Sequence, residues 1–455
     1  MKALEYRCDV LIIGAGPAGL AAAQAALAAG CEVDLVDDNF QSGGQIWRGG
    51  AQIQHDPRAQ NLASILTQSE RLRCHFQSKL IHISGHKDQF TAVLDHTQTP
   101  HCANSKIVAK RVIIGTGARE ILLPFAGWTL PGVTGAGGLQ ALVKGGYPVQ
   151  GKRVVVAGTG PLLLAVAASL VERGAIVTHI VEQSSFSKLN RFAWSLFASP
   201  SKLKQAIQLA WKLRRQKYWS DSYVLEAHGK QQLSKITIVK GGVLHEIESD
   251  YLACGYGLAP NLEIATGLGC TVNFHDDDSS AMPNVRVTEM QESSVAGVYC
   301  AGETTGVGGV DLSLAEGCIA GYAAAFSLDK TVIPKQSQDY ANRQLIAAEK
   351  QRRVWQQFAR RLQQTFQLRP ELKQLCRDDT IVCRCEDVSF SQLQIHSDWR
   401  SAKLHTRCGM GACQGRICGN ANYVLFGWKR DLGRLPLQAT SLNNLLALKE
   451  QAEQN

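Results

Sequence analysis

The sequence predicts an α/β protein in which two nucleotide-binding domains of the βαβ type are nested and a small cysteine-rich domain follows. Three observations support this prediction. A glycine fingerprint, Gly14-Ala-Gly-Pro-Ala-Gly19, lies between an apolar strand and an Ala-rich helix. A second strand–glycine–helix unit starts afresh at Arg153. Five cysteines crowd into residues 383–418, in the last quarter of the chain.

The order of these units predicts how the chain is divided. Strand patterns return after the second unit, so we expect the first domain to be split around it. Residues 43–119 are expected to alternate loops with strands, and residues 185–217 to form a basic helical insertion. The expected parts are residues 1–120 with 255–330 for the first domain, 121–254 for the inserted domain, 331–378 for a helical linker, 379–432 for the cysteine domain and 433–455 for a tail without recognisable chemistry.

Length and composition are those of a globular protein. The 455 residues suffice for two or three domains, and 45% are hydrophobic. Neither a signal peptide nor a run of about 20 apolar residues is evident, so we expect no membrane span. Clustered cysteines without a secretory signal favour metal over disulfides and indicate a reduced, cytoplasmic compartment.

The net charge of +9 comes largely from two stretches with helical periodicity, Lys202–Lys217 and Lys350–Arg361. Each is read as a solvated helix face, or alternatively as a docking surface for an acidic partner. Nucleic-acid modules and basic loops with interleaved aromatic residues are absent, so nucleic acid is excluded as a partner.

The first fingerprint predicts a dinucleotide. Gly14 permits the tight turn, Gly16 lets the backbone approach a pyrophosphate, and Gly19 allows close packing of helix and strand. Asp37 ends the next strand, where a carboxylate can bind ribose hydroxyls. The predicted contacts in this unit are Gly14, Gly16, Pro17, Ala18, Gly19 and Asp37.

The second fingerprint, Gly158-Thr-Gly-Pro-Leu-Leu163, has leucine in place of the third glycine. This side chain either pushes the helix off the strand or fills space near the pyrophosphate. Glu182 still ends the following strand. We therefore expect the fold to be retained and NAD(P) binding to be disfavoured, with a structural domain that has lost its ligand as the preferred interpretation.

The cysteine pattern predicts an iron–sulfur cluster. Cys383 and Cys385 lie on one short loop that can reach one iron, and three later cysteines compete for two further places. The pair Cys413 and Cys418 closes a Gly-Arg loop and is preferred, with Cys408 and Cys413 as the alternative pair. A zinc site and an empty site are the other interpretations, although CxC is an unusual zinc spacing. Arginines that flank the site and would stabilise an anionic centre are Arg384, Arg407 and Arg416.

Four ordered motifs resemble those of two-dinucleotide flavoprotein reductases such as glutathione and thioredoxin reductases. They are Gly14–Gly19, Ile113–Ala118, Ala253–Asn261 and Val298–Gly309. The resemblance implies FAD in the first domain, with an acid after Ala-Gly on the ribitol. The residues it adds to the predicted FAD site are Gly44, Gln45, Gly117, Gly302, Glu303 and Gly309.

A redox disulfide of such reductases is missing. The stretch Gly43-Gly-Gln-Ile-Trp-Arg48 beside the flavin contains no cysteine, and the inserted domain has none before Cys254. Thiol–disulfide chemistry is therefore disfavoured.

The C-terminal segment is similar to bacterioferritin-associated ferredoxin, which implies a [2Fe-2S] cluster on Cys383, Cys385, Cys413 and Cys418. The whole chain resembles the FAD- and iron–sulfur-containing subunit of bacterial multi-subunit amine and imino-acid dehydrogenases. Its motifs include Pro131-Gly-Val133, Ala315-Glu-Gly317, Cys383–Glu386 and Gly409–Arg416. That family includes octopine and nopaline oxidases, hydroxyproline and proline dehydrogenases, and hydrogen cyanide synthase. Cys408 is a departure from its pattern.

This resemblance implies an electron-transfer subunit of a heteromeric oxidoreductase. A flavin-containing partner subunit would oxidise the C–N bond of an opine, hydroxyproline, proline or glycine type of substrate. A small ferredoxin-like subunit is a further expected partner, and membrane association is expected only peripherally, through partners. No catalytic base is assigned in this chain, because its 12 histidines are scattered singly.

Two other functions fit parts of the sequence. The first is a self-sufficient NAD(P)H-dependent reductase that passes electrons to a carrier protein, which Leu163 disfavours. The second is an iron carrier or structural protein with vestigial sites.

Overall fold

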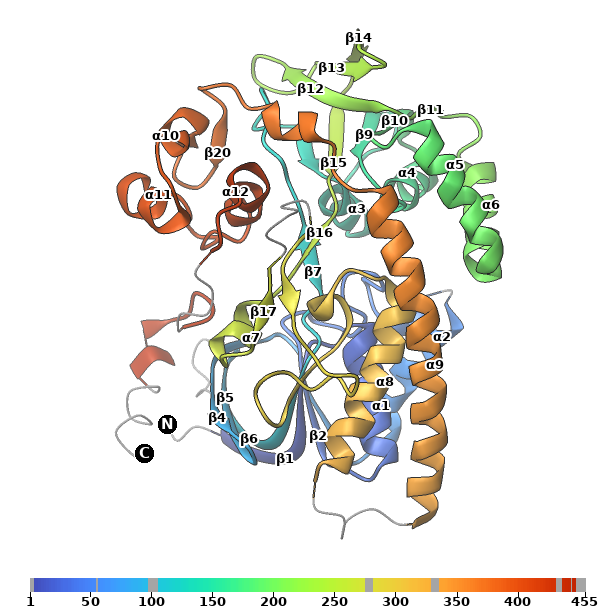
Figure 1. Cartoon of the computed structure of the whole chain (residues 1–455), viewed down its shortest axis with the longest axis vertical. Helices are drawn as coiled ribbons and strands as arrows, with labels where there is room; N and C mark the ends of the chain where they lie inside the picture. Colours follow the sequence, from blue (N-terminus) through green and yellow to red (C-terminus); the bar gives the residue numbers. More distant parts are fainter. Residues whose placement is uncertain are drawn as a thin grey trace.

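A computed structural model of the chain describes residues 4–54, 56–96, 105–274, 281–328, 335–430, 436–442 and 444–446. Two α/β lobes are stacked along the long axis, with the cysteine domain beside the upper one (Figure 1). Among the residues described, no helix is long and apolar enough to cross a membrane. The outer parts of the expected tail, and residues 329–334 at the start of the expected linker, lie outside the described residues.

The lower lobe is built on a seven-stranded sheet of order β3-β2-β1-β6-β5-β4, with β19 paired to β6. The carboxyl-terminal halves of its central strands, Val10–Ile13 of β1 and Val112–Ile114 of β6, are apolar and buried, as expected for parallel strands in the middle of a sheet. Its elements are β1 (Leu4–Ile13), α1 (Pro17–Ala28), β2 (Val33–Val36), η1 (Ala51–Ile53), α2 (Pro57–Gln68), β3 (Leu72–His75), β4 (Ser78–His86), β5 (Gln89–His96), β6 (Ser105–Ile114), α7 (Glu263–Gly267), β17 (Val272–Asn273), β18 (Asn284–Val285), β19 (Val298–Cys300), η3 (Gly302–Thr305) and α8 (Val310–Phe326).

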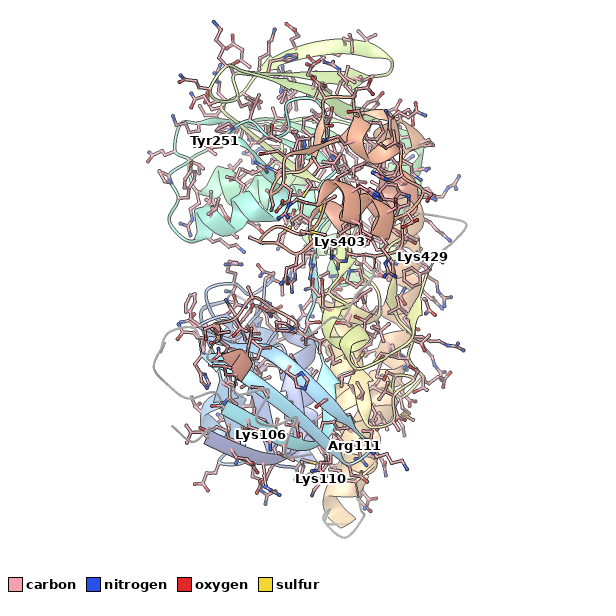
Figure 2. The ribbon with its side chains drawn as sticks, turned by 90° about the vertical axis from the view of Figure 1, so that its left-hand side faces the viewer. Lys106, Lys110, Arg111, Tyr251, Lys403 and Lys429 are labelled. Carbon is pink, nitrogen blue, oxygen red and sulfur yellow. The ribbon has the colours of Figure 1, made fainter. Side chains whose placement is uncertain are left out.

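Close helix packing holds the fingerprint of the lower lobe in place. Helix α8 lies directly on α1, and a Cβ on Gly317 would come within 2.1 Å of the Ala18 carbonyl oxygen. On the sheet, Arg111 of β6 donates to Ser327 Oγ and to its carbonyl oxygen, at 2.6 and 2.7 Å. Figure 2 shows Arg111 near Lys106 and Lys110 on this lobe. The end of α8 is thus fixed to the sheet.

Helix α2 corrects one expectation, since residues 43–119 were expected to hold only loops and strands. Asp56 caps it by accepting from the Arg58 N–H at 3.0 Å, and Pro57 is its first residue. Only a narrow stripe, including Leu62, is buried. An N-cap residue, a proline and a narrow apolar stripe are each weak evidence for a helix, so α2 was not predicted from the sequence.

The inserted lobe holds a five-stranded parallel sheet of order β11-β10-β9-β15-β8 and a three-stranded antiparallel sheet, β12-β13-β14. The expected basic insertion forms a helical hairpin, α5–α6. Strands β7 (Ala118–Glu120) and β16 (Leu258–Pro260) carry the chain between the lobes. The other elements are β8 (Val133–Gly135), α3 (Ala136–Lys144), β9 (Arg153–Gly158), α4 (Leu162–Glu172), β10 (Ile176–Glu182), α5 (Phe186–Ser195), η2 (Leu196–Ala198), α6 (Pro200–Lys212), β11 (Lys217–Trp219), β12 (Ser222–His228), β13 (Lys235–Lys240), β14 (Val243–Glu248) and β15 (Tyr251–Gly255).

The C-terminal part begins with the long helix α9 (Lys335–Thr365), which runs along α8 and reaches the upper lobe (Figure 1). The cysteine domain then packs against the inserted lobe, where Trp128 Nε1 donates to the Ile381 carbonyl oxygen at 2.6 Å. Its elements are η5 (Pro370–Gln374), β20 (Ile381–Cys383), β21 (Val388–Ser389), α10 (Phe390–Gln394), α11 (Trp399–Thr406) and α12 (Cys418–Phe426).

A buried carboxylate joins the cysteine domain to the crossover between the lobes. Glu263 accepts from both terminal nitrogens of Arg119 at 2.8 and 2.9 Å and from Arg430 at 2.8 Å. Burial by itself raises the pKa of this carboxyl, but Arg119 and Arg430 outweigh it and hold the pKa at about 2. Arg430 belongs to the cysteine domain and Arg119 to β7, so Glu263 connects the two.

We predict that Glu263→Gln lowers the free energy of unfolding at pH 7 by about 3–5 kcal/mol, because it leaves two part-buried arginines without their anion. The folded carboxyl has a pKa below the ordinary 4.5, so its stabilisation is present above about pH 4.5 and disappears as the pH falls through about 2. Urea unfolding of both proteins from pH 7 to pH 2.5 tests this, and the difference should shrink towards the acid end.

The matched control is Glu246→Gln, which removes an exposed partner of Lys235 at 2.9 Å and should change stability little. An equal loss in both variants, or a difference that stays constant with pH, contradicts the assigned role of Glu263.

Candidate cofactor sites

The first fingerprint forms the tight turn that its glycines predict. Gly14 has φ +104°, and a Cβ there would lie 2.4 Å from the Gly115 carbonyl oxygen. A Cβ on Gly19 would lie 1.7 Å from the Gly14 carbonyl oxygen. Pro17 and Ala18 open α1, and its first turn faces the carboxyl ends of β1 and β2. Only glycine fits at Gly14 and Gly19, so the backbone is free to approach a phosphate group.

Asp37 lies buried at the end of β2, as predicted. Its Oδ2 accepts from the Ala15 N–H at 2.6 Å, inside the fingerprint, and its Oδ1 accepts from the Asn39 N–H at 2.8 Å. The carboxylate is thereby held beside the glycine turn. The loop that contains Gly44 and Gln45 closes over the fingerprint, since a Cβ on Gly16 would lie 3.9 Å from Gly44 Cα.

Glu303 presents an unsatisfied acceptor. Its Oε1 accepts from the Gly309 N–H at 3.0 Å, whereas its buried Oε2 has no hydrogen-bond partner among the described residues. Burial raises the pKa of this carboxyl to about 7, against the opposing effect of the Gly309 and Gly308 N–H groups. A buried acceptor without a donor fits a bound polyol such as the ribitol of FAD.

Glu316 on α8 is a site residue that sequence reasoning did not single out. Its Oε2 accepts from the Gly302 N–H at 2.9 Å and from Thr305 Oγ1 at 2.7 Å, so it fixes the loop that carries Glu303. Burial raises its pKa to about 7 as well. The only signal was an acid inside an otherwise apolar, small-residue helix, which the motif Ala315-Glu-Gly317 contains.

The crossover loops meet beside this site. Gly117, with φ +68°, precedes β7, and the neighbouring Thr116 carbonyl oxygen accepts from Asn261 Nδ2 at 2.7 Å. Thr116 Oγ1 lies 3.4 Å from Thr304 Oγ1. The first fingerprint, the crossover and the Gly302–Gly309 segment, which were predicted separately, therefore converge on one site.

The second fingerprint keeps the glycine turn, with positive φ at Gly158 and Gly160, and places Leu163 in the core. Leu163 is 1% exposed and belongs to the core of the inserted lobe, where a Cβ on Gly255 would lie 3.8 Å from its Cδ2. The leucine thus fills space between α4 and β15 and does not lie over the phosphate side. Leu163 therefore does not fill the space near the pyrophosphate, which was one of the two alternatives, and is packed in the core between helix and strand.

The segment after α9 covers the carboxyl ends of β9 and β10. The Thr159 hydroxyl donates to Glu182 Oε1 at 3.0 Å and lies 3.4 Å from the Phe366 carbonyl oxygen. The Ser184 hydroxyl donates to the carbonyl oxygen of Thr365, the last residue of α9, at 3.2 Å. A Cβ on Gly160 would lie 4.0 Å from the Phe366 ring. Dinucleotides bind this fold at those strand ends, where the Phe366 and Thr365 carbonyl groups of this chain lie.

Gln183 also binds the segment after α9. Its side-chain amide donates to the Gln367 carbonyl oxygen at 3.1 Å and accepts from the Arg369 N–H at 3.0 Å. Glu182 accepts from the Gly160 N–H at 2.7 Å, so its carboxylate faces its own loop. Glu182 thus makes to its own loop the contact that Asp37 makes to the first fingerprint.

All five clustered cysteines lie together. The Sγ atoms of Cys383, Cys408 and Cys418 are within 4.8 Å of one another and are buried, with Cys408 and Cys418 at 3.9 Å. Cys413 is half-buried, Cys385 is exposed, and these two thiols interact with each other. Cys408, predicted as the spare thiol, therefore belongs to the innermost group.

Sulfur contacts shift the thiol pKa values of this group in both directions, since contacts with neighbouring cysteines raise those of Cys408 and Cys418 and lower those of Cys383 and Cys413. The thiols of Cys408 and Cys418, with the Gly409 and Glu386 N–H groups, lower the pKa of Cys383. The Cys418 thiol lowers the pKa of Cys413. N–H groups directed at sulfur are typical of iron–sulfur sites.

Glycine lets the two cysteine loops meet, because a Cβ on Gly411 would lie 2.2 Å from Cys385 Cβ. The flanking arginines are engaged elsewhere: Arg384 stacks 5.0 Å over Trp128, and Arg407 Nε donates to Glu386 at 2.8 Å. The guanidinium groups of Arg384 and Arg407 are therefore paired with Trp128 and Glu386 and not with the cysteine sulfurs.

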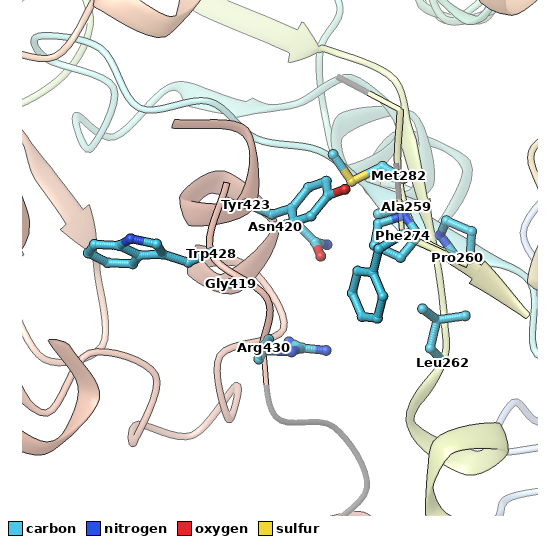
Figure 3. A pocket seen from close by; sticks show the side chains of 11 residues that line it. Ala259, Pro260, Leu262, Phe274, Met282, Gly419, Asn420, Tyr423, Trp428 and Arg430 are labelled. Carbon is cyan, nitrogen blue, oxygen red and sulfur yellow. The ribbon is translucent and has the colours of Figure 1, made fainter. Parts of the chain in front are cut away.

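A small hollow lies at the seam between the cysteine domain and the lower lobe. It begins at Gly419, the residue after Cys418, and the Tyr423 side chain points across it towards Phe274 and Met282 (Figure 3). Arg430, the partner of Glu263, lies at its edge. The seam and the cysteine group are therefore adjacent.

Two nested Rossmann-type domains with this FAD-type site define a flavoprotein oxidoreductase fold, and comparison with known proteins agrees. A family model described as pyridine nucleotide-disulphide oxidoreductase matches residues 8–319, and the chain belongs to this family. Thioredoxin reductase from T. acidophilum shares the fold, with a TM-score of 0.53 at 21% identity over 70% of this chain and 98% of that one. The fold class predicted from the sequence is confirmed.

Relatives in sequence extend beyond this family model. One of the subunits of opine oxidase from Rhizobium meliloti is 29% identical, covering 97% of this chain and 99% of the relative. The HcnB subunit of hydrogen cyanide synthase from Pseudomonas aeruginosa is 28% identical, covering 90% of each chain. L-proline dehydrogenase from P. horikoshii has a TM-score of 0.66 at 19% identity, covering 98% of this chain and 80% of that one. The resemblance to the FAD-type subunits of multi-subunit amine dehydrogenases is thereby confirmed.

We predict that Glu303→Gln weakens flavin retention, because an amide nitrogen would replace the buried acceptor Oε2. Leaving such a partner unpaired typically costs about 1–3 kcal/mol. The flavin absorbance per chain, measured after dialysis, should fall below that of the unaltered protein.

Glu292→Gln is the matched control, since Glu292 also accepts from a glycine N–H, that of Gly297 at 3.0 Å, but lies outside the fingerprints. Equal flavin content in both variants would remove the argument for Glu303 as a ribitol ligand.

Proposed function

We propose that this chain is the electron-transfer subunit of a heteromeric amine or imino-acid dehydrogenase and carries FAD and a [2Fe-2S] cluster. The observation that supports the proposal most is a group of five cysteines fused to a flavoprotein fold. When bound, FAD supplies two-electron chemistry and the cluster supplies one-electron chemistry. The substrate class follows the relatives, which are named as opine oxidase and hydrogen cyanide synthase subunits.

FAD would be held by the first fingerprint and by the loop that follows β19. Gly14, Gly16 and the start of α1 would face the pyrophosphate, Asp37 the ribose and Glu303 the ribitol. Glu316 would act by positioning the Gly302 N–H and not by direct contact. The flavin-binding part would be residues 1–120 with 255–330.

The cluster would use Cys383, Cys385, Cys413 and Cys418. The sequence predicted Cys383 and Cys385 on one iron, whereas the contacts of Cys383 with Cys418 and of Cys385 with Cys413 would pair them on different irons. Cys408 would remain a thiol in this assignment and is the alternative ligand, since its sulfur lies beside those of Cys383 and Cys418 and accepts from Asn422 Nδ2 at 3.5 Å. The cysteine domain would comprise residues 379–432.

The inserted domain, residues 121–254, would serve as a scaffold without NAD(P). The segment after α9 supports this, since its carbonyl groups pair with Thr159, Gln183 and Ser184. This argues against a self-sufficient NAD(P)H-dependent reductase. Oxidation of the C–N bond would then take place on a flavin-containing partner in the cytoplasm, with a small ferredoxin-like protein as a further partner.

We predict that Cys413→Ser and Cys418→Ser abolish the iron content and the paramagnetic signal of the reduced protein. Loss of one thiolate removes a quarter of the ligands of the cluster. Cys408→Ser should retain both signals and is the matched control within the same cysteine group. Iron analysis and electron paramagnetic resonance measure the outcome.

Loss of iron in Cys408→Ser with retention in Cys418→Ser would instead assign Cys408 as a ligand. One zinc per chain and no paramagnetic signal in the unaltered protein would replace the cluster by a zinc site.

We predict that anaerobic mixing with NADH or NADPH leaves the flavin oxidised, because the strand ends that would bind the nicotinamide dinucleotide are covered. Stopped-flow absorbance follows the flavin, and dithionite serves as the control that shows it can be reduced. Bleaching within seconds by either nucleotide would restore the self-sufficient reductase.

A further inference from the structure

The α5–α6 hairpin, residues 186–215, has two apolar faces, whereas an ordinary surface helix has one. The inner face is already covered within the chain. The Phe192 ring lies 5.9 Å from that of Phe358 and 5.3 Å from that of Phe366. Leu209 and Leu213 pack on the core of the inserted lobe. This packing explains why the hairpin is attached, but not its outer face.

The outer face carries large apolar side chains in the open. Trp194 and Phe197 lie together there, with ring centroids 5.6 Å apart. In Figure 1 the hairpin stands at the side of the upper lobe, and α6 projects from it. The exposed fractions are 72% for Phe186, 68% for Trp194, 65% for Phe197, 60% for Ile207 and 69% for Trp211. A cluster of this kind marks an interaction surface.

The charge on the hairpin has one sign. Residues 186–215 contain seven Lys or Arg and no Asp or Glu, in a chain whose net charge is +9. Lys202 pairs with Asp311 at 2.7 Å, and Lys212 pairs with Glu172. The other five, for which no acidic partner is found in the described part of the chain, are Lys188, Arg191, Lys204, Arg214 and Arg215.

We propose that the outer face of the α5–α6 hairpin docks the protein on an anionic lipid surface. Trp and Phe side chains enter the boundary between headgroups and acyl chains, and the flanking Lys and Arg contact lipid phosphates. A lipid surface is favoured over an acidic protein because the hairpin is basic throughout, contains no Asp or Glu and exposes Trp and Phe, which is the composition of an interfacial helix. The proposal is independent of the proposed electron-transfer function.

Arg214 illustrates how the two features combine. Its guanidinium lies 4.2 Å from the centre of the Trp211 ring, and its Nη1 donates to the Trp211 carbonyl oxygen at 2.9 Å. The aromatic ring and the charge are therefore presented together at one end of α6. An interfacial helix places aromatic and basic groups in this way at the headgroup level.

Vesicle co-sedimentation of the full-length chain tests the proposal, with phosphatidylcholine vesicles that contain or lack phosphatidylglycerol. Binding should require the anionic lipid and should fall with salt. Trp194→Ser/Phe197→Ser and Arg214→Gln/Arg215→Gln should each weaken it about tenfold or more. The matched controls are Val243→Ser/Leu244→Ser on β14 and Arg353→Gln/Arg360→Gln on α9, which should bind as the unaltered protein does.

Circular dichroism and flavin content verify that the variants are folded. Absence of binding to anionic vesicles by the unaltered chain overturns the proposal, as does binding that all four variants retain. If the hairpin variants instead lose a co-purifying acidic protein while no protein binds vesicles, the face is an interface between subunits and the lipid proposal is wrong.

Discussion

The buried Glu263 carboxylate is the constraint on which the arrangement of the three parts depends. Arg119 reaches it from the crossover between the lobes and Arg430 from the cysteine domain, so one anion sets the position of both. Two part-buried guanidiniums without an anion would be destabilising, so breaking this contact costs stability. The proposed transfer of electrons between the flavin site and the cysteine group would require a fixed distance between them. The ion cluster supplies such rigidity where the crossover strands are only three residues long.

Much of the FAD-type site could be predicted because its signals are local. Gly14, Gly19 and Asp37 lie within one βαβ unit, where the steric need for glycine and the position of the acid follow from the fold itself. Leu163 was located correctly as a departure, but its consequence could not be read from the sequence. Whether a leucine enters the core or the ligand space depends on the room beside Gly255, almost a hundred residues later.

What the sequence did not reveal depends on contacts between distant segments. Glu316 looks like an ordinary helical acid until Gly302 and Thr305 are brought to it. Phe366 belongs to a polar linker, and nothing near it indicates that its carbonyl group would pair with Thr159, 207 positions away. The choice among the cysteines is also beyond local reasoning, because Cys408 and Cys418 meet only after two loops fold over Cys383.

The inserted lobe has kept the architecture of a nucleotide domain while its surfaces have taken on other contacts. The segment after α9 lies on its ligand edge, the cysteine domain rests on Trp128, and the α5–α6 hairpin extends from the side. These three contacts depend on a rigid inserted lobe and do not require a bound dinucleotide. Leu163 in the core strengthens that platform by filling the space between α4 and β15 that a glycine would leave. Leu163 in the core and the segment after α9 on the strand ends therefore point to the same role for the inserted lobe, that of a structural support.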